Sequence, residues 1–224
     1  LQALAMRIRE AKMIPGLWLR PFQGWKEPAS APIWARVECV DLSDPACIEW
    51  LHETVHVVTR EWEFSYLKLD FLSYDMFGRW GMELLQPRGA RLSPSDDTRT
   101  NMRLIRDGLQ AVRNAAGDDV YILACNCLFG PAIGIVDGMR IGDDVSAWNW
   151  DRTVYMGARA VAAPLFMHGI LWNNDADCML LHEPLSIQQL RTWNGFLSLA
   201  SQSGMVSSVI PELSAERLAL LHRV

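Results

Sequence analysis

The feature that most constrains this chain is the alternation of short apolar, strand-like segments with amphipathic helical segments. About seven strand-like segments are predicted, among them residues 66–71, 120–125, 133–141, 168–172 and 205–210. The spacing of apolar residues predicts helices at 1–11, 44–61, 97–116, 152–166 and 186–199. Because parallel strands need a long connection that is usually a helix, this alternation predicts an α/β protein with a parallel sheet.

Capping residues mark the starts of several predicted helices. Asp44 is a good cap residue, and Pro45 suits the first turn that follows. Ser186 and Gln189 form the spacing of a capping box. Ser214 is placed to cap a last helix. These residues predict where the helices begin.

The length of the chain bears on its domain organisation. We interpret residues 1–224 as one (β/α)8 barrel domain that lacks its first strand, because a closed eightfold barrel needs one strand more, upstream of Leu1. The chain also opens without Met and inside a predicted helix that runs to Ala11. We therefore expect it to be a fragment of a longer protein.

Charge and composition argue against several classes of partner. The 21 basic and 26 acidic residues give a formal net charge of −5, and no basic cluster suggests nucleic acid. No apolar run reaches the ~20 residues needed to cross a bilayer, and the first residues lack a signal-peptide core. The five cysteines form an odd set, which we interpret as reduced thiols. We expect a cytoplasmic protein without a cofactor, and the sequence is compatible with a homo-oligomer.

Residues 66–71 have a polar face that is unusual for a strand. Side chains alternate across a strand, so one face carries Tyr66, Lys68 and Asp70 and the other carries two leucines and a phenylalanine. In a parallel barrel the leucines would face the surrounding helices. Lys68 and Asp70 would face the axis at the carboxyl-terminal mouth, where such barrels have their active sites. The alternative is an edge strand with a surface ion pair.

A second acidic segment offers a partner for Asp70. Strand geometry over residues 139–145 would put Arg140 and Asp144 on one face, with a glycine between them that leaves space for a substrate. Two carboxyl groups about 5–5.5 Å apart suit a retaining glycosidase, with one nucleophile and one acid/base. Lys68 would favour the ionised form of Asp70, whereas the acid/base must hold a proton. The alternative is two unrelated acidic residues at loop ends.

Two further patterns leave other functions open. The segment from His52 through Glu53 to His56 matches H-E-x-x-H, in which two histidines one helical turn apart bind zinc and the glutamate acts as a base. A third ligand would have to come from Glu61, Glu63 or further away. Tryptophans gather at predicted strand ends and loops, either as core residues or as platforms for sugar rings. They are Trp18, Trp25, Trp80, Trp148, Trp150 and Trp172.

Five segments, in order along almost the whole chain, carry a family resemblance. They are Pro15–Phe22, Val40–Pro45, Tyr66–Phe71, Gly130–Val145 and Leu171–Cys178. Together they resemble the catalytic barrel of the α-galactosidases of glycoside hydrolase family 36, which are related to family 27 in the same clan. Within them, Lys68 and Asp70 match the K-x-D motif of the nucleophile strand, and Arg140 and Asp144 match the R-x-x-x-D motif of the acid/base strand.

The resemblance implies a (β/α)8 barrel that cleaves terminal α-galactosides with retention, through a covalent glycosyl-enzyme intermediate. Asp70 would be the nucleophile and Asp144 the acid/base. The expected partner is an oligosaccharide or galactoside substrate, and the alternative within this resemblance is a non-catalytic carbohydrate-binding relative. The substrate-binding residues would be Lys68, Arg140, Cys125 and Trp18.

The sequence also departs from the family pattern. We find neither the first strand, with its paired-aspartate sugar-binding motif, nor the β-domains that flank the barrel in the family. Ala176 stands where proline is usual in the Asn-Asp-Pro-Asp segment, and Asn126 stands where glycine is commoner.

Overall fold

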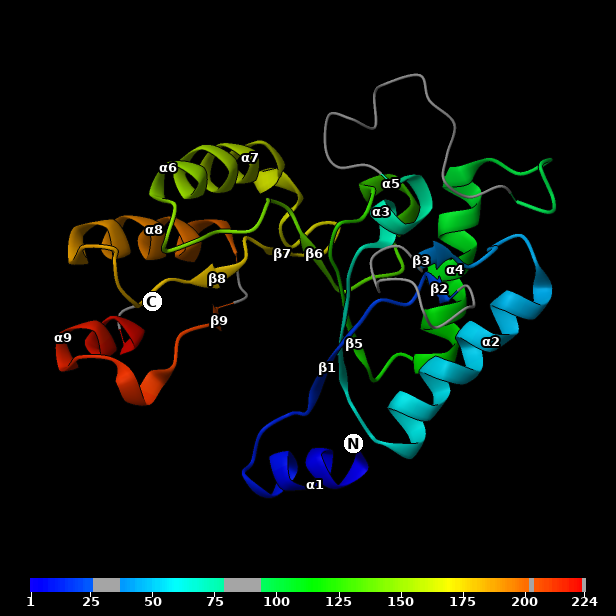
Figure 1. Ribbon diagram of the computed structural model, residues 1–224, viewed down its shortest axis with the longest axis horizontal. Helices are drawn as coiled ribbons and strands as arrows, with labels where there is room; N and C mark the ends of the chain where they lie inside the picture. Colours follow the sequence, from blue (N-terminus) through cyan, green and yellow to red (C-terminus); the bar gives the residue numbers. More distant parts are fainter. Residues whose placement is uncertain (26–36, 79–93, 202–203, 223–224) are drawn as a thin grey trace. The chain divides into compact units, whose positions relative to one another are not determined.

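A computed structural model of the chain describes residues 1–25, 37–78, 94–201 and 204–222 (Figure 1). The chain divides into two compact units, Leu1–Asp137 and Gly138–Val224. Within the described ranges, no helix combines the length and the apolar character needed to cross a bilayer.

Three parallel strands organise the first unit. They are β1 (Gly16–Leu19), β4 (Tyr66–Leu69) and β5 (Tyr121–Ala124), in the order β1-β4-β5. Leu67 and Leu69 of the central strand are fully buried, while Tyr66 and Lys68 on its other face are half-buried. The alternation predicted for this segment is therefore present, and it gives the sheet one apolar face and one polar face.

Helices flank these strands in the first unit. The larger ones are α1 (Gln2–Glu10), α2 (Pro45–His56), which continues as the π-helical turn η2 (Val57–Glu61), and α4 (Asn101–Ala116). The smaller elements are α3 (Leu72–Phe77), α5 (Phe129–Ala132) and the antiparallel pair β2 (Gln23–Trp25) and β3 (Val37–Cys39). Helices α2 and α4 pack against each other (Figure 1). A Cβ on Gly108 of α4 would lie 2.9 Å from the Phe22 ring, so only glycine allows this close approach.

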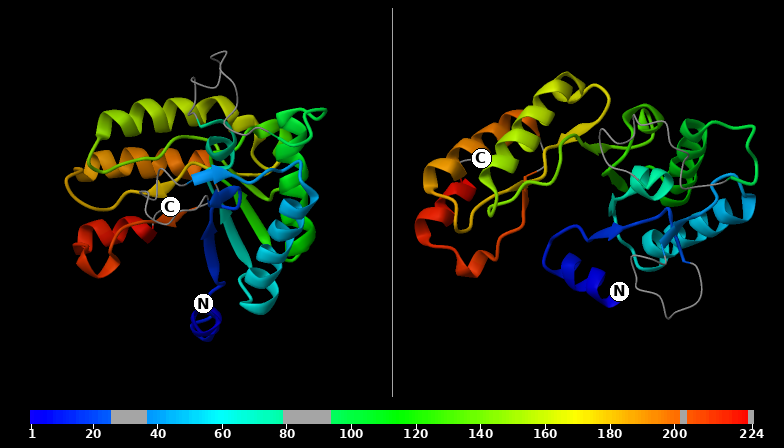
Figure 2. Two further views of the ribbon diagram at one scale, coloured as in Figure 1. Left: turned by 45° about the vertical axis from the view of Figure 1, so that its right-hand side comes forward. Right: turned by 45° about the horizontal axis from the view of Figure 1, so that its top comes forward.

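Two pairs of parallel strands lie in the second unit. They are β6 (Gly138–Arg140) with β7 (Asn173–Asp175), and β8 (Cys178–Met179) with β9 (Met205–Val206). A helical stretch runs through α6 (Trp150–Arg152), η4 (Thr153–Ala158), α7 (Arg159–Ala162) and η5 (Ala163–Met167). It lies alongside α8 (Ile187–Ala200), as both views in Figure 2 show. The chain continues through η6 (Ile210–Glu212), α9 (Ala215–Leu218) and η7 (Ala219–His222).

The predicted α/β class with parallel strands is confirmed, and so are the predicted caps. Asp44 accepts a hydrogen bond from the Ala46 N–H at 2.8 Å, and Ser186 and Gln189 form a complete capping box. The helix predicted from residue 97 begins instead at Asn101, because the side chain of Thr100 caps it.

Several predicted boundaries were wrong. The predicted strand 133–141 is a strand only over Gly138–Arg140, because the preceding residues form α5 and a turn at Gly134, whose φ is +76°. The predicted strand 168–172 contains only an isolated bridge, and β7 starts at Asn173. The first part of the loop predicted after Ser73 is helix α3. Residues 79–93, and with them Trp80, lie outside the described residues. So does the first half of another expected strand, residues 33–40, whose second half contains β3.

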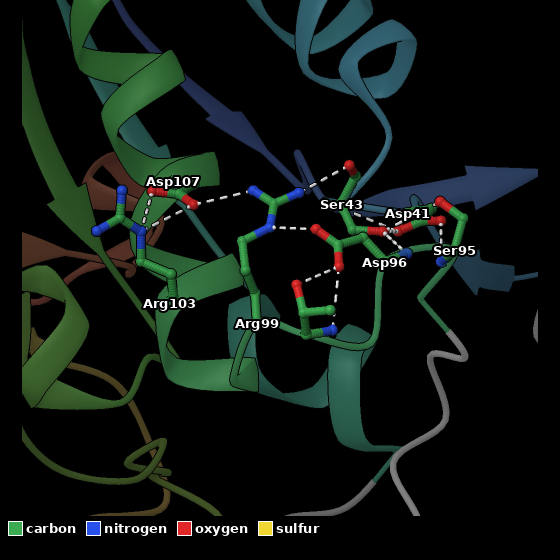
Figure 3. Close-up of polar contacts among 8 residues, drawn as sticks. Asp41, Ser43, Ser95, Asp96, Arg99, Arg103 and Asp107 are labelled. Atoms are coloured by element: carbon green, nitrogen blue, oxygen red, sulfur yellow. Dashed lines mark hydrogen bonds and ion pairs between the residues drawn. The ribbon is translucent and has the colours of Figure 1, made fainter.

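A polar network joins the start of α2 to the residues before α4 (Figure 3). One carboxylate oxygen of Asp41 accepts hydrogen bonds from the N–H and hydroxyl of Ser43, at 2.9 and 2.6 Å. The other oxygen accepts a bond from the Ser95 N–H at 2.8 Å. The Ser43 hydroxyl in turn accepts a bond from the Asp96 N–H at 3.0 Å, and Arg99 donates to the Ser43 carbonyl at 2.8 Å. These hydrogen bonds hold the residues just before α2 to the residues just before α4, although the two segments are far apart in the sequence.

Candidate active site

Asp70 lies at the carboxyl end of β4, where its main chain and side chain are both fixed. Its N–H donates to the Leu19 carbonyl at 2.9 Å and so extends the ladder between β1 and β4. Its Oδ2 accepts a hydrogen bond from Trp18 Nε1 at 3.1 Å, and its Oδ1 accepts one from the Phe71 N–H at 2.7 Å. Both donors stabilise a negative charge on this carboxylate. Trp18 and Asp70, two of the predicted site residues, are therefore in direct contact.

The chain leaves β4 through a strained residue. Phe71 has a φ of 60°, in the left-handed region that costs a non-glycine residue on the order of 1 kcal/mol or more. Its ring makes an edge contact with Trp18, with centroids 6.3 Å apart, and the Arg20 guanidinium lies 4.3 Å from the ring centroid. These contacts hold Phe71 in place and turn the chain sharply just after Asp70.

A buried ion pair stabilises the turn after Asp70. Arg20 Nε donates to both carboxylate oxygens of Asp75, at 2.9 and 3.0 Å, and Asp75 is fully buried in α3. The Asp75 N–H donates to the Phe71 carbonyl at 2.8 Å. Arg20 follows β1 and Asp75 follows β4, so the pair ties together the loops after two neighbouring strands.

Asn126 supplies the cap that α3 lacks within its own sequence. The Phe71 side chain makes no capping bond, and the first N–H groups of α3 are instead bound by Asn126. The main-chain carbonyl of Asn126 accepts a bond from the Ser73 N–H at 2.7 Å, and its side-chain Oδ1 accepts one from the Tyr74 N–H at 2.9 Å. Asn126 has a φ of 46°, a conformation that asparagine and glycine tolerate best. This geometry gives a physical reason for asparagine at position 126.

Two more predicted residues lie on the same strands. Cys125 follows β5 directly, is buried, and donates from its N–H to the Leu69 carbonyl at 2.7 Å. Lys68 pairs in register with Trp18 of β1. No ion pair among the described residues joins Lys68 to Asp70, so the surface ion pair of the alternative interpretation is not formed.

In the second unit, Arg140 is buried at the end of β6 between two carboxylates. Its Nη2 lies 2.7 Å from Asp144 Oδ1 and 2.6 Å from Asp177 Oδ2. The side chain of Asp144 is 78% exposed, whereas that of Asp177 is 13% exposed. The predicted neighbourhood of Arg140 and Asp144 is therefore present, and Asp177 offsets the charge of the guanidinium from the buried side.

Asp177 is a residue whose role the sequence analysis missed. Its Oδ2 also accepts a bond from the Val145 N–H at 2.8 Å, and its own N–H donates to Asp175 Oδ1 at 2.8 Å. It has a φ of 84°. The sequence feature that could have indicated this role is the position of Asp177 in the segment that resembles Asn-Asp-Pro-Asp. Asp70 belongs to the first unit and Asp144 to the second, and their pairing stays a prediction.

The zinc alternative finds little support in this geometry. The rings of His52 and His56 are nearly parallel on α2, with centroids 6.5 Å apart. The described part of the chain contains no group of three or more His, Cys, Asp or Glu side chains that could hold a metal ion.

A scan against models of known protein families finds no match. Solved structures, however, share the fold. The α-galactosidase of Thermus thermophilus in complex with p-nitrophenyl α-D-galactopyranoside has a TM-score of 0.72 and 22% identity, over 99% of this chain and 49% of that one. A structure of the same enzyme with stachyose has a TM-score of 0.71 and 22% identity, over 99% and 51% of the two chains.

A more distant likeness points to the same fold. The family 36 α-galactosidase of Geobacillus stearothermophilus, in complex with 1-deoxygalactonojirimycin, has a TM-score of 0.62 and 13% identity, over 100% of this chain and 32% of that one. This chain spans about half the length of the Thermus enzyme. At these identities the likeness establishes the fold, an α/β arrangement with parallel strands similar to that of α-galactosidases.

Proposed function

We propose that this chain is the catalytic portion of a retaining glycoside hydrolase that cleaves terminal α-galactosides, built on a (β/α)8 barrel. The observation that carries the proposal is the position of Asp70. It lies at the carboxyl end of a parallel strand, with each carboxylate oxygen held by one donor. Such strand ends carry the active sites of parallel barrels. The likeness in fold to α-galactosidases solved with galactosides supports the substrate class.

In the proposed mechanism, Asp70 attacks the anomeric carbon of the galactoside while Asp144 donates a proton to the departing glycosidic oxygen. The bond to the leaving group breaks, and a galactosyl ester of Asp70 forms. Asp144 then takes a proton from water, whose oxygen displaces Asp70. Two successive inversions give net retention at the anomeric carbon.

The contacts of each carboxylate suit its proposed role. The donors from Trp18 and Phe71 orient Asp70 and leave further lone pairs on its oxygens for attack. An acid/base must gain and lose a proton, and the exposed Asp144 side chain is open to both water and substrate. Asp177 shares the Arg140 guanidinium with Asp144, so the guanidinium is not bound by Asp144 alone.

Azide rescue tests the two roles separately. Asp70→Gly and Asp144→Ala are each incubated with p-nitrophenyl α-galactoside and sodium azide. In Asp70→Gly, azide enters from the face that Asp70 occupied, so we expect β-galactosyl azide. In Asp144→Ala, azide attacks the galactosyl ester from the opposite face, so we expect α-galactosyl azide. NMR of the products distinguishes the two anomers.

A second variant gives the outcome that would refute the proposal. Asp70→Asn keeps the shape of the side chain and removes the nucleophile, and we expect its turnover to fall by at least about 10³-fold. Turnover equal to that of the wild type in Asp70→Asn would exclude Asp70 as the nucleophile. Rescue of both variants to the same anomer would exclude the proposed division of roles.

A further inference from the structure

A pocket of about 470 Å³ lies within the second unit. This volume is within the range of ~300–1,000 Å³ that is usual for small-molecule sites. The loops after β6, β8 and β9 supply side chains to it. Those that matter here are Trp148, His182, Glu183, Ser208, Glu212 and Arg217.

Trp148 is the most unusual of these side chains. It is 77% exposed, although tryptophan normally buries much of its large apolar surface. The main-chain N–H of Trp148 donates to the Ser146 hydroxyl at 3.1 Å, and the centroid of the indole ring lies 6.3 Å from that of the His182 ring. The indole therefore lines the pocket beside the His182 ring, and most of its surface stays available to a ligand.

The charges of the pocket disfavour an anionic ligand. His182 Nδ1 and the Ser208 hydroxyl lie 2.9 Å apart, which fixes both side chains. The buried Arg217 pairs with Glu183 at 2.6 Å and also donates to the Leu185 carbonyl at 2.7 Å, so its charge is already matched. Glu212 has no ion pair among the described residues and adds a negative charge. An acidic or phosphorylated ligand would be repelled.

We propose that this pocket binds a pyranose ring of a neutral oligosaccharide, with the apolar face of the sugar stacked on Trp148. His182, Ser208 and Glu212 would hydrogen-bond to its hydroxyl groups, since hydroxyl, imidazole and carboxylate groups match the donors and acceptors of a sugar. The carbohydrate class rests on the proposed function. Trp148 lies on the same loop after β6 as Asp144.

The test measures binding without turnover. Stachyose is titrated calorimetrically into the Asp70→Asn protein and into the same protein carrying Trp148→Ala, Trp148→Phe or Trp50→Ala. We expect Trp148→Ala to weaken stachyose binding about tenfold, and Trp148→Phe to recover most of the loss because it restores an aromatic face. Trp50, on α2 of the first unit, is 44% exposed and serves as a matched control that should leave the affinity unchanged.

Hydrolysis of p-nitrophenyl α-galactoside by the wild type, measured in parallel, separates the two proposals. If the wild type does not hydrolyse it but Trp148→Ala still loses stachyose binding, the proposed function fails and the sugar pocket stands. If the wild type hydrolyses it and Trp148→Ala binds stachyose as tightly as its parent, the pocket proposal is overturned. Absence of stachyose binding to the Asp70→Asn protein would also overturn it.

Discussion

Position 126 requires a residue that tolerates a left-handed main chain and that can also cap helix α3. Asn126 meets both: it has a φ of 46° and binds the first N–H groups of α3. The sequence analysis noted asparagine there only as a departure from a family pattern. The contact that explains it joins residues 52 positions apart, and no local pattern reports such a contact.

Two substitutions separate these requirements. Asn126→Gly should keep the conformation and lose the side-chain cap, at a cost of about 1 kcal/mol in the free energy of unfolding. Asn126→Ala should lose the cap and also strain the main chain, at a cost of about 2 kcal/mol. Urea denaturation of the two variants measures the difference. An equal loss in both would show that the main-chain conformation is not what selects asparagine.

Paired substitutions also test the contribution of the buried ion pair between Arg20 and Asp75. Arg20→Met would leave the fully buried carboxylate of Asp75 without its ion pair, and we expect a loss of about 3–5 kcal/mol in the free energy of unfolding. Arg103→Met is the matched control, because Arg103 is exposed and its ion pair with Asp107 should contribute less than about 1 kcal/mol. A similar loss in both variants, measured by urea denaturation, would contradict this difference.

At the scale of elements, the network around Asp41 holds the start of α2 to the segment before α4. Burial raises the pKa of Asp41, but the hydrogen bonds from Ser43 and Ser95 outweigh this effect and lower it to about 2. The ionised form is therefore the one that the folded protein stabilises. The sequence analysis predicted the cap at Asp44 and missed Asp41, because the partner Ser95 lies far along the chain.

The pH dependence of stability tests this assignment. A folded pKa of about 2 lies below the ordinary value of 3.8, so Asp41 should stabilise the fold above pH 3.8 and lose this contribution as the pH falls towards 2. Because water screens the site, we expect the wild type to exceed Asp41→Asn by only about 1 kcal/mol above pH 4. Urea denaturation between pH 2 and 6 measures the difference, with Asp118→Asn as an exposed control. A difference that does not change with pH would argue against the ionised carboxylate.

At the scale of the whole molecule, the order of strands and helices already predicts the α/β class. Parallel strands need long connections, which are usually helices. The structure has parallel pairing between β1, β4 and β5 and between β6 and β7. Boundaries were less predictable. Residues 133–137 are apolar enough for a strand, yet α5 ends just before them at Ala132 and a turn at Gly134 occupies most of that segment. Apolar composition indicates burial there without specifying the backbone conformation.

The features that depend on neighbouring residues follow from local sequence: the alternating faces of residues 66–71, the caps at Asp44 and Ser186, and the strand end that presents Asp70. The tertiary structure alone decided the contacts of that site, from the Trp18 bond to Asp70 to the support of the following turn by Asn126. The pairing register of β1, β4 and β5 brings these distant residues together. Local propensity acts over a few residues, whereas register depends on the packing of whole elements.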